Sequence, residues 1–129
     1  MPYKYYYNCL KYILSIVKEE KKKVIYFCEK DDLDFVNETI NKLKIHFENL
    51  EFIRADDNIE DWQQMLLMSC CNSNIIANSS FSWWSAYFNR NPTKIVCYPE
   101  QWFGKAAGSD HSDISDLIPD GWKKINIRD

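Results

Sequence analysis

The segment that most constrains the fold of this chain runs from residue 75 to residue 87. It opens with an apolar run over residues 75–77, changes to the small polar residues Asn78, Ser79 and Ser80, and then becomes rich in aromatic side chains. The apolar run is typical of a strand buried in a parallel sheet. The polar residues are types that cap helix N-termini, because their side-chain oxygens accept backbone N–H groups of the first turn. The segment therefore predicts a strand, a tight loop and a helix in direct succession.

A helix that opens at the carboxyl end of a parallel strand is suited to binding anions. Its first backbone N–H groups have no acceptor within the helix, and the helix dipole places positive charge at the same point. Open α/β sheets bind their ligands in the crevice at the carboxyl ends of the strands. Ser79, Ser80 and Ser82 would bring hydroxyl groups to a diphosphate there, and the alternative is that they only cap the helix. The sequence therefore predicts a diphosphate site at this turn.

Strands and helices are predicted to alternate along the whole chain. Apolar residues at spacings of three and four predict helices, and short continuous apolar runs predict buried strands. We expect helices over residues 3–18, 33–47, 59–70 and 80–89, and strands over residues 24–28, 50–53, 75–77, 94–98 and 122–127. This alternation is typical of an α/β fold, a Rossmann-like parallel sheet with crossover helices. The chain length fits a single domain, residues 1–129.

The positions of the glycines argue against two classes of nucleotide site. The chain has 3 glycines, Gly104, Gly108 and Gly121, and all of them come late in the sequence. Dinucleotide-binding and P-loop sites need a glycine-rich turn between a strand and a helix. We therefore expect neither an NAD-binding domain with a glycine fingerprint nor a P-loop kinase.

Composition and charge narrow the function further. The formal net charge is -3, which gives no electrostatic footprint for a nucleic-acid backbone. No Cys-x-x-Cys or His-rich spacing predicts a metal site. Neither a signal-peptide core nor an apolar stretch of about 18 residues is present, so no membrane span is expected. Cysteines within apolar runs are expected to be reduced core residues of a cytoplasmic protein: Cys9, Cys28, Cys70, Cys71 and Cys97.

Acidic residues occur where two of the predicted helices begin. Asp31 and Asp32 follow the strand over residues 24–28. One of them can cap the next helix, or the pair can line a nucleotide cleft and accept hydrogen bonds from ribose hydroxyls or the guanine edge. Asp61 lies in the first turn of the helix over residues 59–70. It complements the helix dipole there and is a second candidate for the cleft.

Aromatic side chains provide candidate walls for a ligand. Trp83 and Trp84 are adjacent in sequence and cannot share a helix face, so one is expected in the core while the other covers a cleft or a neighbouring element. Trp102 and Phe103 follow the strand over residues 94–98 and could form an apolar wall, with core packing as the alternative. His111 lies in a small, polar, acidic stretch typical of a loop, and we assign it no catalytic role.

A longer pattern surrounds the helix turn. Met-Leu-Leu-Met-Ser-Cys-Cys occupies residues 65–71, Asn-Ser-Ser-Phe-Ser-Trp-Trp occupies residues 78–84, and Lys94-Ile95-Val96, Pro99 and Trp102-Phe103 follow. This pattern resembles the α-1,2-fucosyltransferase family, glycosyltransferase family 11, in its C-terminal, GDP-fucose-binding half. The resemblance extends from about Tyr6 over most of the chain. Family members carry a His-x-Arg-Arg-x-Asp motif just upstream of this half, and the present sequence has no such motif.

The resemblance implies the donor-binding half of a GT-B-type glycosyltransferase. Its reaction would transfer L-fucose from GDP-fucose to a galactoside glycan, with inversion at the anomeric carbon and an α-1,2 linkage. It implies no metal or other cofactor, because GT-B enzymes typically meet the charge of the departing diphosphate with cationic groups and helix N-termini. Catalytic residues stay unassigned. The implied donor-binding residues are Asp31, Asp32, Asn78, Ser79, Ser80, Phe81 and Ser82, and the candidate cleft residues are Asp61, Trp83 and Trp102.

Two functions of different classes remain open at this point. The first is a fucosyltransferase fragment whose missing arginine motif comes from an upstream domain or a partner chain, since Arg54, Arg90 and Arg128 stand in no matching context. The second is a module that binds a nucleotide sugar, or only structural partners, without turnover. An unrelated nucleotide-sugar transferase with the same anion site is a third alternative. We expect the residues as written to be soluble, whereas a full-length family member can associate with a membrane.

Overall fold

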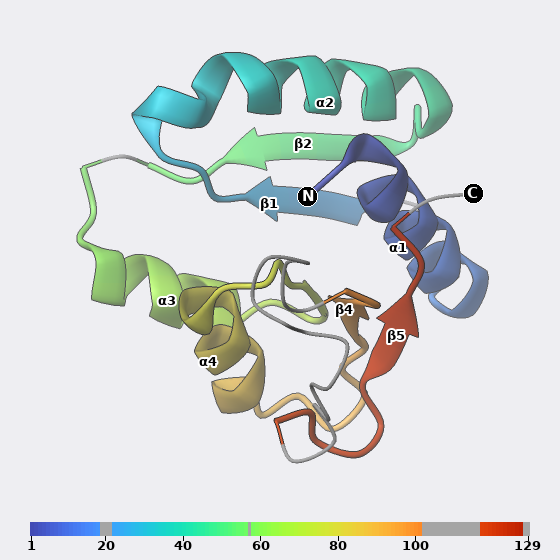
Figure 1. Ribbon diagram of the computed structural model, residues 1–129, viewed down its shortest axis with the longest axis vertical. Helices are drawn as coiled ribbons and strands as arrows, with labels where there is room; N and C mark the ends of the chain where they lie inside the picture. The colour runs from blue at the N-terminus through green and yellow to red at the C-terminus, as the bar shows by residue number, and fades with distance from the viewer. Residues whose placement is uncertain (19–21, 57, 102–116, 128–129) are drawn as a thin grey trace.

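Helices and strands alternate in the computed structural model, which describes residues 1–18, 22–56, 58–101 and 117–127 (Figure 1). The alternation predicted from the apolar pattern is therefore confirmed, and the fold is α/β. Trp102, Phe103 and His111 lie outside the described residues. In chain order the elements are α1 (Tyr3–Ile16), β1 (Lys22–Tyr26), the 3-10 turn η1 (Lys30–Asp32), α2 (Leu33–His46), β2 (Leu50–Arg54), α3 (Asp61–Ser69), β3 (Asn74–Ile75), α4 (Ser80–Phe88), β4 (Val96–Pro99) and β5 (Lys123–Ile125).

All strand pairs among the described residues are parallel. β1 pairs with β2, with Val24 opposite Phe52. β3, β4 and β5 pair in that order, with Ile75 opposite Cys97 and Cys97 opposite Lys123. Parallel neighbours need crossover connections, and α2 connects β1 to β2 while α4 connects β3 to β4. This arrangement is consistent with a Rossmann-like fold.

Neighbouring residues of β4 contribute to two different hydrophobic layers. Cys97 packs in a cluster with Tyr5 of α1. The preceding residue, Val96, packs in another cluster with Met68 of α3 and Ala86 of α4. Because successive residues of a strand point to opposite faces, α1 covers one face of this sheet, and α3 and α4 cover the other. In Figure 1, α3 and α4 lie together and away from α2.

A third cluster joins α1 and α2 to the first two strands. Leu10 of α1 packs with Ile40 and Leu43 of α2, and Val24 of β1 packs against them. Ile75 of β3 packs against both this cluster and the cluster that holds Cys97. The layer containing β1 and β2 therefore borders β3, with α1 contributing to the core on both sides of that border.

The limits of all five described strands differ from the prediction, and β1 and β4 show the physical reasons. β1 begins and ends two residues earlier than expected, at Lys22–Tyr26, because its first residue already pairs with Leu50 of β2. β4 begins at Val96 and includes Pro99, which pairs with Ile125 of β5. Pro99 has no backbone N–H, so it joins the strand without donating a ladder hydrogen bond. β4 therefore begins two residues later and ends one residue later than predicted.

The helix α3 begins later than predicted and leaves its apolar stripe at the surface. It starts at Asp61, after a capping box in which Glu60 and Gln63 bond each other's backbone N–H groups. Trp62 is 57% exposed and Leu66 is 50% exposed. The side of α3 that packs against α4 and the sheet instead carries the buried Met68.

The five cysteines are free, but they do not all lie in the core. Cys9 and Cys97 are buried, as predicted. Cys70 is exposed, which corrects the prediction of a core position, because it occupies the C-cap of α3 rather than a packed face. Cys28 and Cys71 are half-buried, and burial raises the pKa of the Cys71 thiol.

Candidate functional site

The turn between β3 and α4 forms as the sequence predicts. α4 begins at Ser80, and its N-cap is Ser79, whose hydroxyl accepts a hydrogen bond from the Ser82 backbone N–H at 3.2 Å. The Trp83 N–H donates to the Ser79 carbonyl at 3.1 Å. The N–H groups of Ser80 and Phe81 have no acceptor within a helix that starts here. This end of α4 therefore offers two backbone donors together with the positive end of the helix dipole.

The side chains at this turn divide into an internal group and an exposed group. Ser82 is 6% exposed; its hydroxyl bonds the Ala77 carbonyl at 3.0 Å and lies 2.8 Å from the Ser79 hydroxyl. Ser82 therefore ties the loop to the helix, and a phosphate contact from its hydroxyl would have to replace one of these bonds. Asn78 and Ser80 are exposed, and neither side chain bonds another described residue.

The acidic turn after β1 presents two exposed carboxylates. Asp31 and Asp32 lie in η1, and Asp32 holds the N-cap position of α2. No side-chain hydrogen bond caps α2, so the capping alternative lacks its usual bond. Asp61 is the first residue of α3 and is exposed as well. All three carboxylates thus stand at helix N-termini, where negative charge complements the helix dipole.

The acidic turn follows β1 and the α4 turn follows β3, and these two strands belong to different sheets. Phe27, which comes directly after β1, packs against the cluster that contains Ile76, directly after β3. The carboxyl ends of β1 and β3 are therefore joined through one hydrophobic cluster. No hydrogen bond or ion pair between described residues connects Asp31 or Asp32 to Ser79. A ligand that contacted both turns would have to span the space between them.

The two tryptophans of α4 differ in burial, and Trp84, rather than the candidate cleft residue Trp83, is the exposed one. Trp83 is half-buried against the cluster that contains Met68 and Val96, and its indole N–H donates to the Leu117 carbonyl at 2.9 Å. Phe81 packs against the same cluster. Trp84 is 43% exposed. Trp83 therefore serves packing, and Trp84 is the indole at the molecular surface.

Buried polar contacts hold the other end of α4. Asn89, which is 4% exposed, donates to the Cys71 carbonyl at 2.7 Å and to the Asn74 side-chain oxygen at 2.8 Å. The Lys94 ammonium donates to the carbonyls of Ala86 and Asn89, each at 2.8 Å. Burial lowers the pKa of Lys94. These bonds fix the axis of α4 and hence the direction in which its N-terminus points.

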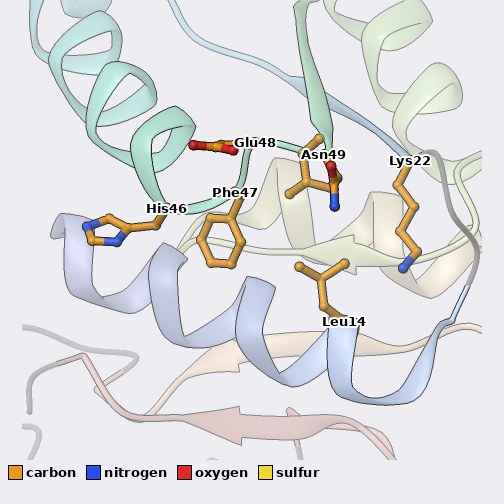
Figure 2. A pocket seen from close by; sticks show the side chains of 7 residues that line it. Leu14, Lys22, His46, Phe47, Glu48 and Asn49 are labelled. Atoms are coloured by element: carbon orange, nitrogen blue, oxygen red, sulfur yellow. The ribbon is translucent and has the colours of Figure 1, made fainter.

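A hollow of about 330 Å³ lies elsewhere, at the amino ends of β1 and β2 (Figure 2). Figure 2 shows Lys22 and Leu14 directed toward each other, with His46 and Glu48 pointing away from them. The Lys22 ammonium already donates to the Val17 carbonyl at the end of α1. The hollow is open and lies at the amino ends of strands, whereas the α4 turn follows the carboxyl end of β3. We therefore assign it no ligand. Its lining residues are Leu14, Lys22, His46, Phe47, Glu48, Asn49 and Leu50.

The described residues contain neither a metal-binding cluster nor a helix that could span a membrane. No group of three or more His, Cys, Asp and Glu side chains in this part of the chain is close enough to hold a metal ion. No helix among the described elements is both long and apolar enough to cross a membrane.

Arg54 is a candidate site residue that the sequence reasoning set aside. It is the last residue of β2 and stands opposite Tyr26, the last residue of β1. Its side chain is half-buried at the carboxyl end of β2, beside the end of β1, and the acidic turn follows β1. The signal available in the sequence was its position at the end of an apolar run, because ligand-binding side chains of α/β sheets gather at the carboxyl ends of strands.

Sequence comparison relates the helix turn and its surroundings to a known family. The sequence model described as "Glycosyl transferase family 11" matches residues 4–112, which include every described residue of β1 through β4. The chain belongs to glycosyltransferase family 11. Its predicted resemblance to that family is thereby confirmed.

Two relatives from Escherichia coli give more detail on this family 11 chain. The first, an alpha-1,2-colitosyltransferase, is 29% identical over 122 residues, which are 95% of this chain and 38% of the relative. The second, the O-antigen biosynthesis glycosyltransferase WbnK, is 34% identical over 131 residues, covering 98% of this chain and 37% of the relative. The chain thus spans less than two fifths of the length of either relative. No solved structure matches it.

The family is described by glycosyl transfer, and its sequence model matches this chain over residues 4–112. The α4 turn lies within the region that the family shares. Its exposed amide, exposed hydroxyl and two backbone N–H groups are donors of the kind that bind phosphate oxygens.

Proposed function

We propose that this chain is the donor-binding half of an α-1,2-fucosyltransferase-like enzyme of the GT-B type, which transfers L-fucose from GDP-fucose to a galactoside acceptor. Membership of glycosyltransferase family 11 supports the transfer chemistry. The printed name of one relative supports the α-1,2 linkage, and its colitosyl group is the alternative donor sugar to be tested. The whole enzyme would include the part of the relatives that has no counterpart in this chain.

The N-terminus of α4 is the observation that carries the proposal. The diphosphate of GDP would accept hydrogen bonds from the backbone N–H groups of Ser80 and Phe81 and from the exposed side chains of Asn78 and Ser80. Ser79 and Ser82 would act indirectly, because their hydroxyl groups bond each other and hold the turn in shape. Asp31 and Asp32 would accept hydrogen bonds from the ribose or the guanine edge.

The same geometry explains how the chain would assist bond cleavage. An acceptor hydroxyl attacks the anomeric carbon as the bond between that carbon and the diphosphate oxygen breaks, so negative charge grows on GDP. Donors that already point at this charge lower the barrier, because they need no reorganisation during the reaction. Arg54, at the carboxyl end of β2, would contribute a cation, and the upstream half or a partner chain would add the arginine motif. We propose no metal or other cofactor for this step.

The absence of a His-x-Arg-Arg-x-Asp motif from these residues favours a second candidate function. A module with the α4 turn and without that motif could bind a nucleotide sugar without transferring it. The two functions differ in turnover. A fucosyltransferase half should release GDP from GDP-fucose and a galactoside once the arginine-bearing half is supplied as a separate polypeptide, whereas a binding module should not.

Calorimetric titration of the purified 129-residue chain with GDP, GDP-fucose and a GDP-linked colitosyl donor tests the proposal. We expect dissociation constants on the order of micromolar to millimolar. Ser80→Ala should weaken GDP binding by about ten- to a hundredfold, because it removes one hydrogen bond to a charged group. Ser15→Ala is the matched control, because Ser15 lies on the exposed side of α1 and bonds only the Tyr12 carbonyl among the described residues. Absence of binding to a chain that is folded by circular dichroism would refute donor binding by this half alone.

A further inference from the structure

The hydrogen bonds between β3 and β4 stop at a proline. In a parallel ladder, a residue donates to the residue before its partner and accepts from the residue after it. Asn74 donates to the Ile95 carbonyl, and Ile76 donates to the Cys97 carbonyl, each at 2.9 Å. The next bond in this register would run from the N–H of residue 99 to the Ile76 carbonyl.

Pro99 cannot make that bond, because proline has no backbone N–H. The neighbouring hydrogen bonds show which strand the Pro99 nitrogen faces. The Glu100 N–H donates to Ile125 of β5 at 2.9 Å, so residue 100 faces β5 and residue 99 faces β3. Ile76 is fully buried. Its carbonyl would therefore lack both its ladder donor and water, which is a costly state for a backbone group.

Tyr5 of α1 supplies the missing donor. Its hydroxyl donates to the Ile76 carbonyl and lies 3.2 Å from the Cys97 carbonyl. Cys97 already accepts the Ile76 N–H, so Ile76 is the carbonyl that needs the hydroxyl. The ring of Tyr5 is completely buried, in the cluster that also contains Cys9. Burial, with a smaller contribution from Cys9, raises the pKa of Tyr5, so the hydroxyl keeps its proton.

The bond lies one residue before the turn that leads into α4. Ala77 follows Ile76, and the Ala77 carbonyl accepts the Ser82 hydroxyl at 3.0 Å. Ser82 in turn contacts the N-cap Ser79. A continuous set of hydrogen bonds therefore connects α1, the end of β3 and the first turn of α4.

We propose that Tyr5 is a positioning residue for the donor site: its hydroxyl replaces the N–H that Pro99 lacks and thereby fixes the end of β3 that carries the α4 turn. The effect on donor binding rests on the proposed function. The effect on the turn itself does not, and it can be measured without any ligand.

The experiment compares Tyr5→Phe, Pro99→Ala and the Tyr5→Phe, Pro99→Ala double variant. Tyr5→Phe removes the donor and keeps the ring. Pro99→Ala restores a backbone N–H at the position where the ladder requires one. Tyr6→Phe is the matched control, since Tyr6 is the next residue of α1 and its hydroxyl bonds no other described residue.

Hydrogen exchange of the peptide covering residues 76–82 and titration with GDP are the two readouts. We expect Tyr5→Phe to speed exchange about tenfold and to weaken GDP binding about fivefold, changes typical of losing one buried hydrogen bond. The double variant should return toward the parent chain in both measurements, and Tyr6→Phe should change neither.

Either of two results would overturn the proposal. One is exchange in Tyr5→Phe that matches the parent chain. The other is a double variant whose residues 76–82 exchange as fast as those of Tyr5→Phe, or that is unfolded when Tyr5→Phe is also unfolded. In either case the N–H restored by Pro99→Ala would not have replaced the Tyr5 hydroxyl. A parent chain that binds no GDP would refute donor binding, while the exchange results would still decide the role of Tyr5.

Discussion

Ser79 sets the point at which α4 begins. Its hydroxyl accepts the Ser82 N–H and contacts the Ser82 hydroxyl, so one side chain satisfies an otherwise unpaired donor and orients a second side chain. Removing an N-cap hydroxyl leaves a first-turn donor without its acceptor. The stability of the chain and the shape of its anion site therefore depend on the same oxygen atom.

We predict that Ser79→Ala lowers the free energy of unfolding by about 1 kcal/mol, the usual value for loss of an N-cap. Urea unfolding followed by circular dichroism measures this change. Ser79→Asp should retain most of the stability, because a carboxylate also caps and complements the helix dipole. Equal stability of Ser79→Ala and the parent chain would show that the cap contributes nothing.

Residue identity predicted part of this local arrangement. The run Asn78, Ser79, Ser80 indicates a cap, because each residue type accepts a first-turn N–H. It does not indicate which of the three holds the N-cap position, since that depends on where β3 stops. The internal role of Ser82 was missed, because it depends on the Ala77 carbonyl, whose direction is set by the tertiary structure.

At the scale of elements, α4 is held at both ends. Asn89 at its C-terminus donates to the Cys71 carbonyl and to Asn74, and Asn74 donates to the Met68 carbonyl at 2.8 Å. These amides link the end of α3, the start of β3 and the end of α4. Buried amides that satisfy one another in this way specify one arrangement of the elements, because any shift would leave a polar group without a partner.

Asn89→Ala should therefore be more destabilising than a surface change. We expect a loss of about 2 to 3 kcal/mol in the free energy of unfolding, because the half-buried Cys71 carbonyl and the buried Asn74 side-chain oxygen would both lose a partner. Asn91→Ala is the control: its bonds to Asn72 and Thr93 are exposed, and its cost should stay below about 1 kcal/mol. Equal losses in the two variants by urea unfolding would contradict this account.

The sequence predicted which segments are helices and which are strands more reliably than it predicted where they begin and end or which faces are exposed. Apolar periodicity gave the four helices that the structure describes, because burial of one face follows from spacing. The limits of β1 depend on its pairing with Leu50, which local sequence does not encode. The surface position of Trp62 and Leu66 depends on which face of α3 meets α4. The sequence did not reveal that the Tyr5 hydroxyl replaces the N–H that Pro99 lacks, because this depends on the register of β3 and β4.

For the whole molecule, buried protonated groups make stability depend on alkaline pH. Burial raises the pKa of Cys9, of Tyr5 and of Tyr6, the last to about 12. In the unfolded chain the thiol ionises from about pH 8.5 and the phenols from about pH 10. The folded chain then holds more protons than the unfolded chain, so the free energy of unfolding falls as pH rises.

We predict full stability below about pH 8.5 and a decline above it, by about 1.4 kcal/mol per pH unit for each group that has ionised in the unfolded chain. Urea unfolding at a series of pH values between 7.5 and 11 measures the decline. Cys9→Ala should make the decline between about pH 8.5 and 10 less steep, because the half-buried Cys71 thiol, whose pKa is also raised, is then the thiol that still contributes below the range of the phenols. A free energy of unfolding that stays constant between pH 7.5 and 11 would contradict the burial of these groups.

The first helix also packs on the last strand, and this has a consequence for synthesis. Asn8 of α1 donates to the Asn126 carbonyl at 3.1 Å, across a separation of 118 positions. Ribosomes add about 5–20 residues per second, so the partner surface of α1 emerges on the order of ten seconds after α1 itself. During that interval the side of α1 that carries Tyr5 and Cys9 stays uncovered and open to chaperones. Translation must therefore reach β5 before that side of α1 is completely covered.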